Sequence, residues 1–311
     1  MLETGFEKNL TEQGLQIPFF VERLKAISRT FRSDSRHLLI IDGLDDILSY
    51  RDIQYRSLAA LVLEVTRLNM MFRSNGTPAK IILLCRTDLF ERLPGANKNK
   101  VRQDSATTLD WYHDPRQPEN SNLIKLINRR ARLSDPNVGD TFQEFFPSKF
   151  DGKEIRASLL DLTRHTPRDF IQLLVHIQKF ARDQKISNDQ MLSGIRDYSI
   201  NYFIPEIKDE LVGYVDFEHI NTMLQLLGSL RKREFHVKEL FDRAEEQSNT
   251  SQLDLPSILN ALFECSAIGN IQNSPNGSTY FTFKYRNRNS SFSFNDRIIL
   301  HKGMWKALNL V

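Results

Sequence analysis

The sequence predicts an α/β domain built on part of a parallel sheet, followed by an all-helical segment and a C-terminal winged-helix domain. Three observations carry this prediction. Residues 37–47 and 80–88 each pass from an apolar run into polar residues, with a helical pattern between them, which implies a βαβ unit. The periodic segments of residues 122–205 are helical. Residues 214–311 contain three helical patterns and then a hairpin signal.

The α/β domain is predicted from the order of its apolar patterns. Residues 17–30 place apolar side chains at helical spacing and feed the first strand, HLLIIDGLDDI, whose unbroken apolar start is typical of a buried parallel strand. Residues 55–72 form the next helix, which the loop SNGTPAK ends. The second strand, KIILLCRTD, also finishes in polar residues, and ligands of parallel sheets bind beyond such strand ends.

The pattern of the C-terminal region, residues 214–311, differs from that of the helical segment before it. Helices are expected around residues 219–230, 237–246 and 255–263, and Asn276-Gly277 between two β-rich runs predicts a hairpin. Three helices followed by a hairpin describe a winged helix. We therefore expect three domains, at residues 1–114, 115–212 and 213–311.

Composition excludes several protein classes. The 311 residues include 42 Lys+Arg against 39 Asp+Glu, 40% hydrophobic residues and two cysteines. Cys85 and Cys265 lie 180 positions apart, which suits a reducing, cytoplasmic setting and not a disulfide scaffold. No apolar run is long enough for a membrane span, and no zinc spacing or G-x-S-x-G motif occurs.

The strongest candidate site is the acidic cluster after the first strand. Asp42, Asp45 and Asp46 arrive together at its C-terminal end, where one carboxylate suits hydrated Mg²⁺ and another suits the orientation of an attacking water. Arg86 follows the second strand. A structural reading is also open, in which the aspartates cap a helix and Arg86 pairs with Asp88.

These motifs are similar to those of P-loop ATPases. LLIIDGLDD resembles the Walker B motif, especially in its STAND and NACHT form, and CRTD occupies the sensor-1 position. Pro167 and Arg168, in TRHTPRDFIQLL, resemble the sensor-2 signature of the helical lid, although proline also suits a first helical turn. The order of Walker B, sensor 1, lid and winged helix resembles a bacterial P-loop ATPase, AAA+-like, of the ORC-like or STAND (NACHT-like) type.

The resemblance implies ATP and Mg²⁺ as cofactors and gives each residue a role. Asp42 would hold the metal, Asp45 would polarise water with Asp46 beside it, and Arg86 would sense the γ-phosphate. Pro167 and Arg168 would act on the nucleotide from the lid.

One departure concerns the phosphate-binding loop. P-loop ATPases cradle the phosphates in G-x-x-x-x-G-K-[ST], and this sequence contains no such motif. Asp42 also follows Met1 too closely for the usual preceding strand, loop and helix. We expect an N-terminally truncated piece of a longer ATPase, the alternative being a natural short form without the loop. Hydrolysis by this chain alone is not expected.

A second candidate site is basic and aromatic. Residues 280–306 carry six basic side chains against Asp296, and aromatic side chains alternate with them. In a winged helix, Lys284, Arg286 and Arg288 would meet the phosphates of DNA. The structural reading is two amphipathic strands with aromatic side chains inward and cations outward.

Two function classes are therefore open. The first is a nucleotide-dependent switch or ATPase module that controls itself or a partner protein through its domain angles. The second is a non-catalytic remnant whose winged helix binds DNA or a protein, with the α/β part as scaffold.

Overall fold

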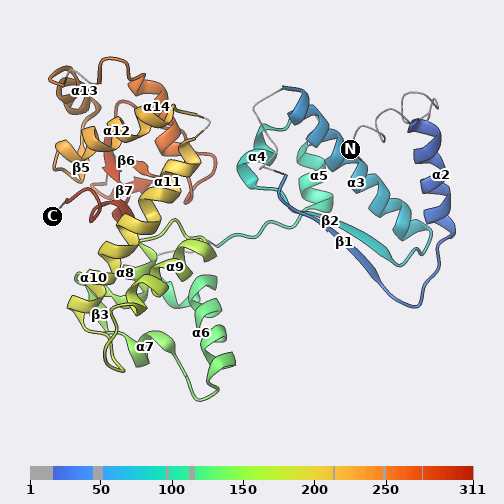
Figure 1. The fold of residues 1–311 in the computed structure, drawn as a ribbon, viewed down its shortest axis with the longest axis horizontal. Coiled ribbons are helices and arrows are strands. Elements are labelled where there is room, and N and C mark those ends of the chain that lie inside the picture. The colour runs from blue at the N-terminus through green and yellow to red at the C-terminus, as the bar shows by residue number, and fades with distance from the viewer. Residues whose placement is uncertain are drawn as a thin grey trace, which may run out of the picture. The chain divides into compact units, whose positions relative to one another are not determined.

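The computed structural model describes residues 17–44, 52–95, 98–111, 116–212, 214–247, 250–274 and 276–310. The chain forms two compact units, which meet in sequence between Thr108 and Leu109. Figure 1 shows the elements of each unit.

The N-terminal unit contains one parallel strand pair and helices around it (Figure 1). Its elements are α2 (Ile17–Thr30), β1 (His37–Ile41), α3 (Asp52–Ser74), β2 (Ala79–Leu83), α4 (Thr87–Arg92) and α5 (Lys98–Ser105). β1 and β2 pair in parallel, with α3 between them in the chain. The predicted strand, helix and strand are therefore present. A single strand pair does not test whether these strands belong to the larger parallel sheet of a P-loop ATPase core.

Hydrogen bonds fix the register of this strand pair. The His37 N–H donates to the Pro78 carbonyl over 2.7 Å, and the Leu84 N–H donates to the Ile41 carbonyl over 2.8 Å. Gly76, with a φ of 64°, turns the chain between α3 and β2 in a conformation that favours glycine. A small apolar core forms beneath, around Leu58 and Leu89.

The prediction that the first strand is buried was wrong for the residues that the structure describes. Leu38, Leu39 and Ile40 keep 57%, 56% and 55% of their surface exposed. An unbroken apolar run predicts a strand, but its burial depends on what else packs there. Leu38 and Ile40 point to one face of β1 and Leu39 points to the other, so both faces stay accessible.

The C-terminal unit begins with helices. They are η1 (Pro118–Asn120), α6 (Asn122–Ser134), α7 (Thr141–Phe145), α8 (Ile155–Leu160), α9 (Pro167–Gln178), α10 (Asn188–Tyr198), the π-helical η2 (Ser199–Phe203) and α11 (Ile204–Leu211). The short strands β3 (Lys149–Phe150) and β4 (Lys153–Glu154) pair before α8. Phe142, Phe170 and Tyr198 are fully buried in the core between these elements.

Three helices and a small antiparallel sheet complete this unit. The elements are α12 (Phe217–Ser229), β5 (Glu234–Phe235), α13 (Val237–Glu245), α14 (Leu255–Glu264), β6 (Ile268–Asn273), β7 (Thr279–Thr282), β8 (Arg297–Leu300) and η4 (Lys302–Met304). The strand order is β5-β8-β6-β7, and every neighbouring pair is antiparallel. One hydrophobic core joins these elements to the preceding helices.

The hairpin predicted at Asn276-Gly277 forms between β6 and β7, and Gly277 has a φ of 83°. The predicted alternation of aromatic side chains does not hold. Phe281, which was expected to face inward together with Phe283, is 40% exposed, whereas Phe283 is buried. β7 ends at Thr282, and the Arg286 N–H donates to the Phe283 carbonyl over 3.0 Å in a turn. None of the helices in the described ranges is long and apolar enough to cross a membrane.

Candidate functional site

Asp42 and Arg86 lie at the same edge of the strand pair. Parallel pairing puts the carboxyl ends of β1 and β2 side by side, with Ile41 opposite Leu83. Asp42 follows β1 directly, and Arg86 occupies the position before α4. Both side chains are exposed. The structure therefore puts the two predicted residues that follow these strands at one edge of the strand pair.

A glycine shapes the turn after β1. Gly43 has a φ of 73°, which side chains with a Cβ rarely adopt. Its N–H donates to Asp42 Oδ1 over 2.8 Å, and Oδ2 is a further acceptor on this exposed carboxylate. Asp45 and Asp46, the other two predicted carboxylates, lie outside the described residues.

This edge has the chemistry for one metal–phosphate contact. A carboxylate oxygen is a ligand that Mg²⁺ accepts, and Mg²⁺ usually keeps several waters beside one or two carboxylates. A guanidinium binds phosphate oxygens through two parallel hydrogen bonds. Within the described ranges no group of three or more His, Cys, Asp or Glu gathers as a metal cage. Asp42 alone therefore represents the predicted acidic cluster here.

The predicted lid residues lie at the start of α9. Thr166 caps this helix, since its Oγ1 accepts the Asp169 N–H over 3.1 Å, and Pro167 occupies the first turn. The Arg168 side chain is 75% exposed, with Nη1 3.7 Å from Glu206 Oε1. Arg168 is thus available to a ligand at the surface of the C-terminal unit.

The aspartate of the same motif has a structural role that the sequence did not reveal. Arg164 and Asp169 keep 7% and 1% of their side chains exposed, with Nε and Oδ2 2.9 Å apart. Arg164 Nη1 also donates to Glu210 Oε1 over 2.7 Å, and the Tyr202 hydroxyl donates to Asp169 Oδ1 over 3.0 Å. Burial pushes the pKa of Asp169 up, but the guanidinium outweighs burial and holds that pKa below its usual value.

The basic residues of the predicted nucleic-acid surface differ in their surroundings. Lys284 Nζ lies 3.0 Å from Glu264 Oε1, and Arg286 lies over the rings of Phe283 and Tyr285, 3.8 Å from Asp161. Arg288 is exposed. Two of the three predicted cations are therefore partly neutralised within the unit.

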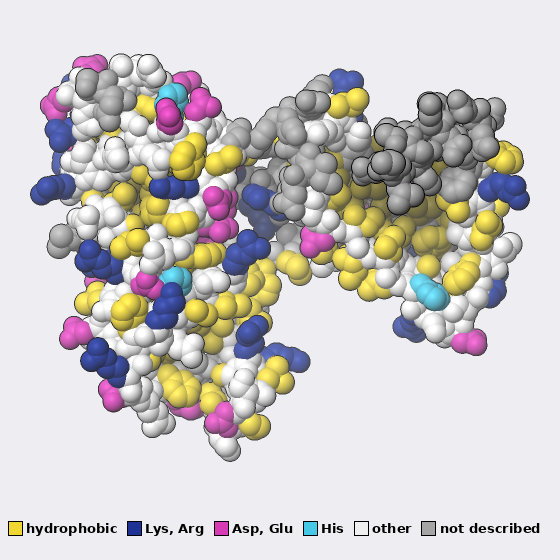
Figure 2. All heavy atoms as spheres, viewed as in Figure 1, with side chains coloured by type: hydrophobic (Ala, Val, Ile, Leu, Met, Phe, Trp, Pro, Cys, Tyr) yellow, Lys and Arg dark blue, Asp and Glu magenta, His cyan; other side chains and the backbone are white. Residues whose placement is uncertain are grey.

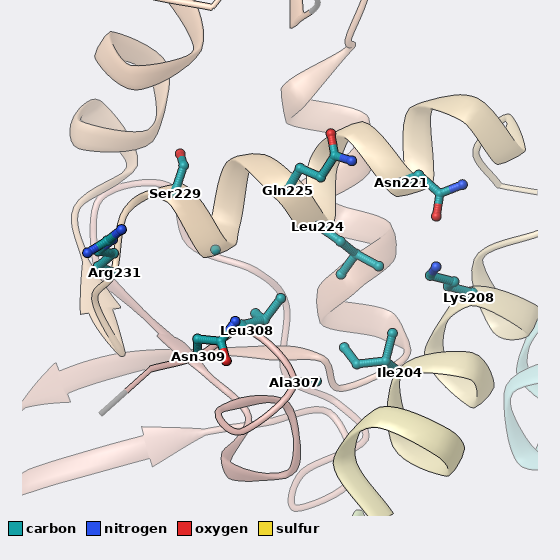
Figure 3. Close-up of a pocket in the computed structure, with 11 residues that line it drawn as sticks. Ile204, Lys208, Asn221, Leu224, Gln225, Ser229, Arg231, Ala307, Leu308 and Asn309 are labelled. Atoms are coloured by element: carbon teal, nitrogen blue, oxygen red, sulfur yellow. The ribbon is translucent and has the colours of Figure 1, made fainter. Parts of the chain in front are cut away.

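A pocket that the sequence did not predict opens beside α12 (Figure 3). Its volume is about 760 Å³, and its walls come from α11, α12 and the segment after η4. Lys208 and Arg231 stand at its two ends, with Asn221 and Gln225 between them along the helix. Lys208 and Arg231 are the charged side chains among the described residues of this lining.

Comparison with known proteins matches one segment of the chain. Residues 121–203 match the model of a FunZ-associated C-terminal helical domain. This match starts at Ser121, which caps α6, and ends at Phe203, the last residue of η2. It therefore covers the elements from α6 to η2 of the C-terminal unit, about a quarter of the chain. Neither the curated proteins nor the solved structures contain a match.

Proposed function

We propose that this chain is part of a nucleotide-dependent switch and that the edge formed by Asp42 and Arg86 contributes its metal and γ-phosphate contacts. One observation carries the proposal: the parallel register of β1 and β2 puts an exposed carboxylate and an exposed guanidinium at the same strand ends. Ligands of parallel sheets bind at such ends. Mg²⁺ would sit on Asp42, and Arg86 would contact the terminal phosphate.

The missing phosphate loop limits the affinity that this site can reach. The sequence contains no G-x-x-x-x-G-K-[ST], whose amides and lysine supply much of the nucleotide affinity in P-loop proteins. We therefore expect Mg-ATP affinity in the millimolar range and no hydrolysis by this chain alone. A cytoplasmic setting belongs to the proposal too, because two cysteines 180 positions apart in the sequence suit a reducing compartment.

Calorimetry with matched variants tests this function. Asp42→Asn removes the proposed metal ligand, and Arg86→Ala removes the proposed phosphate contact. Each is expected to weaken Mg-ATP binding and to reduce its heat. Asp34→Asn, an exposed change before β1, and Arg73→Ala, an exposed change at the end of α3, are expected to bind as wild type does. Binding that is equal in all five proteins would refute the site.

A second candidate function is supported by the C-terminal unit. Helices α12, α13 and α14 followed by the β6–β7 hairpin are the elements of the predicted winged helix. Arg288 is exposed beyond the hairpin, and Arg231 and Arg233 are exposed after α12, whereas the neighbouring Lys232 is paired with Glu239. These cations support binding to DNA phosphates or to an acidic protein surface.

Fluorescence anisotropy with labelled duplex DNA tests the second function. Affinity is expected to fall steeply with added salt and to fall further in Arg288→Ala. Lys284→Ala is the matched control, because its ammonium is already paired with Glu264 and its loss should matter less. Salt-independent binding, or equal affinities of wild type and Arg288→Ala, would count against DNA recognition by this surface.

A further inference from the structure

The two outer edges of the β1–β2 pair differ. Alternate residues of a parallel strand direct both N–H and C=O to the same neighbour. Since the His37 N–H and the Ile41 carbonyl bond to the β2 side, the N–H and C=O of Leu38 and Ile40 face away from it. On the outer edge of β2, the corresponding groups of Ile81 are taken by the Asn69 side chain, through two bonds of 2.8 Å. Asn69 caps one edge, and among the described residues no corresponding cap covers β1.

The uncapped edge is also apolar. Leu38, Leu39 and Ile40 are each more than half exposed, and they lie in consecutive positions of β1. An exposed apolar edge with open backbone groups is a template for another strand. Figure 2 shows hydrophobic side chains on the visible surface of this unit.

The residues around β1 are complementary to themselves. Arg36 and Asp42, both exposed, flank the apolar run at equal distances from Leu39. In antiparallel pairing centred on Leu39, Leu38 lies opposite Ile40 of the second strand, and Arg36 lies opposite Asp42. Cβ atoms of directly opposite residues are about 4.5–5.5 Å apart, which is within reach of an ion pair.

Two neighbouring registers also pair the outward-facing backbone groups of Leu38 and Ile40, but the side-chain pairs that they form are less favourable. A shift in one direction puts Asp34 opposite Asp42, and a shift in the other puts Leu38 opposite Asp42. Like charges directly opposite are destabilising. Charge and backbone direction therefore select the same register.

We propose that β1 pairs antiparallel with β1 of a second copy of this chain, in the register centred on Leu39. The two copies form a four-stranded sheet in the order β2-β1-β1-β2. Four hydrogen bonds join Leu38 and Ile40 across the two-fold axis, and an Arg36–Asp42 ion pair closes each end. Because a single short strand pair buries less than the ~1,200 Å² of typical stable complexes, the association is weak and reversible.

Charge exchange tests this contact by sedimentation velocity over a range of concentrations. Arg36→Asp places two carboxylates opposite each other at both ends, and Asp42→Arg places two cations there. Each single variant is expected to self-associate about tenfold or more weakly than wild type. Their one-to-one mixture is expected to associate again, because each end of the mixed dimer then pairs a carboxylate of one variant with a guanidinium of the other. Arg73→Asp, a reversal at the end of α3, is the control and should associate as wild type does.

The backbone part of the contact is tested by Ile40→Pro. This change removes an N–H that faces away from β2, so it leaves the β1–β2 bonds intact and is expected to abolish association. Circular dichroism checks that every variant is folded. A wild-type chain that stays monomeric at all concentrations overturns the proposal, as does a mixture that fails to associate or a single reversal that associates unchanged.

The proposed dimer rests on a different contact from the proposed nucleotide site, although both use Asp42. Variants at other residues therefore test the two proposals independently. Arg36→Asp keeps both Asp42 and Arg86, so it is expected to lose self-association and retain Mg-ATP binding. The reciprocal result is expected for Arg86→Ala, which should bind Mg-ATP more weakly than wild type and self-associate as wild type does.

Discussion

At the scale of single residues, the buried Arg164–Asp169 pair makes the C-terminal unit sensitive to the loss of either partner. Arg164→Met would leave the Asp169 carboxylate buried without its counter-charge, and breaking one partner of a buried pair costs about 3–5 kcal/mol. Arg168→Met, at the 75% exposed position of the same motif, should cost less than about 0.5 kcal/mol. Urea unfolding followed by tryptophan fluorescence measures this difference, because Trp111 and Trp305 both lie in this unit. Equal midpoints for the two variants would contradict the assignment.

His301 makes stability depend on pH. Burial, together with the nearby Arg164 guanidinium, lowers the pKa of this imidazole from 6.5 to about 3, and its Nδ1 accepts the Gly303 N–H over 3.0 Å. Between pH 3 and pH 6.5, His301 is therefore protonated in the unfolded chain and neutral in the folded chain. The contribution of neutral His301 to the free energy of unfolding is fully present above pH 6.5 and is lost as the pH falls toward 3. From pH 7 to pH 5, the loss should be about 2 kcal/mol.

Unfolding at several pH values measures that slope. His301→Asn keeps a hydrogen-bond acceptor but does not titrate, so its free energy of unfolding should vary less between pH 5 and pH 7. A slope as steep as that of wild type would show that another group is responsible.

At the scale of secondary-structure elements, α9 and α10 cross closely at a glycine. A Cβ on Gly194 would lie 2.4 Å from Ile177 Cα and 3.0 Å from the His176 carbonyl oxygen. These are backbone atoms, so the helices themselves would have to separate. Gly194→Ala should destabilise the unit by about 1–3 kcal/mol despite the better helix propensity of alanine. Ser193→Ala, at the exposed neighbouring position, should change it by less than about 0.5 kcal/mol in the same unfolding measurement.

Element boundaries show what the sequence could predict. Apolar periodicity predicted a helix over residues 17–30, which is the range of α2, and a helix over residues 55–72, which lies within α3. Both patterns are local, as is the Asn276-Gly277 turn. Burial is not local: the exposure of the two faces of β1 depends on which elements pack against them. Likewise, Arg164 donates a hydrogen bond to Glu210, which lies 46 positions away, and no spacing in the sequence predicts that contact.

At the scale of the whole molecule, the predicted lid and winged-helix segments lie in one compact unit, while the α/β segment forms another. A continuous core crosses the expected boundary near residue 212, with Leu211 and Ile220 both buried in it. A signal that reaches either segment is therefore expected to affect the other. In the proposed switch, nucleotide state acts on this unit as one body.

The proposed contact between Arg86 and the γ-phosphate is tested most directly by comparing Mg-ATP and Mg-ADP binding in one calorimetric series. Wild type should bind ATP more tightly than ADP, because only ATP offers the terminal phosphate to the guanidinium. Arg86→Ala should bind both nucleotides equally and weakly, and Arg73→Ala should keep the wild-type preference. A wild-type chain that binds neither nucleotide, or an ATP preference that survives Arg86→Ala, would contradict this contact.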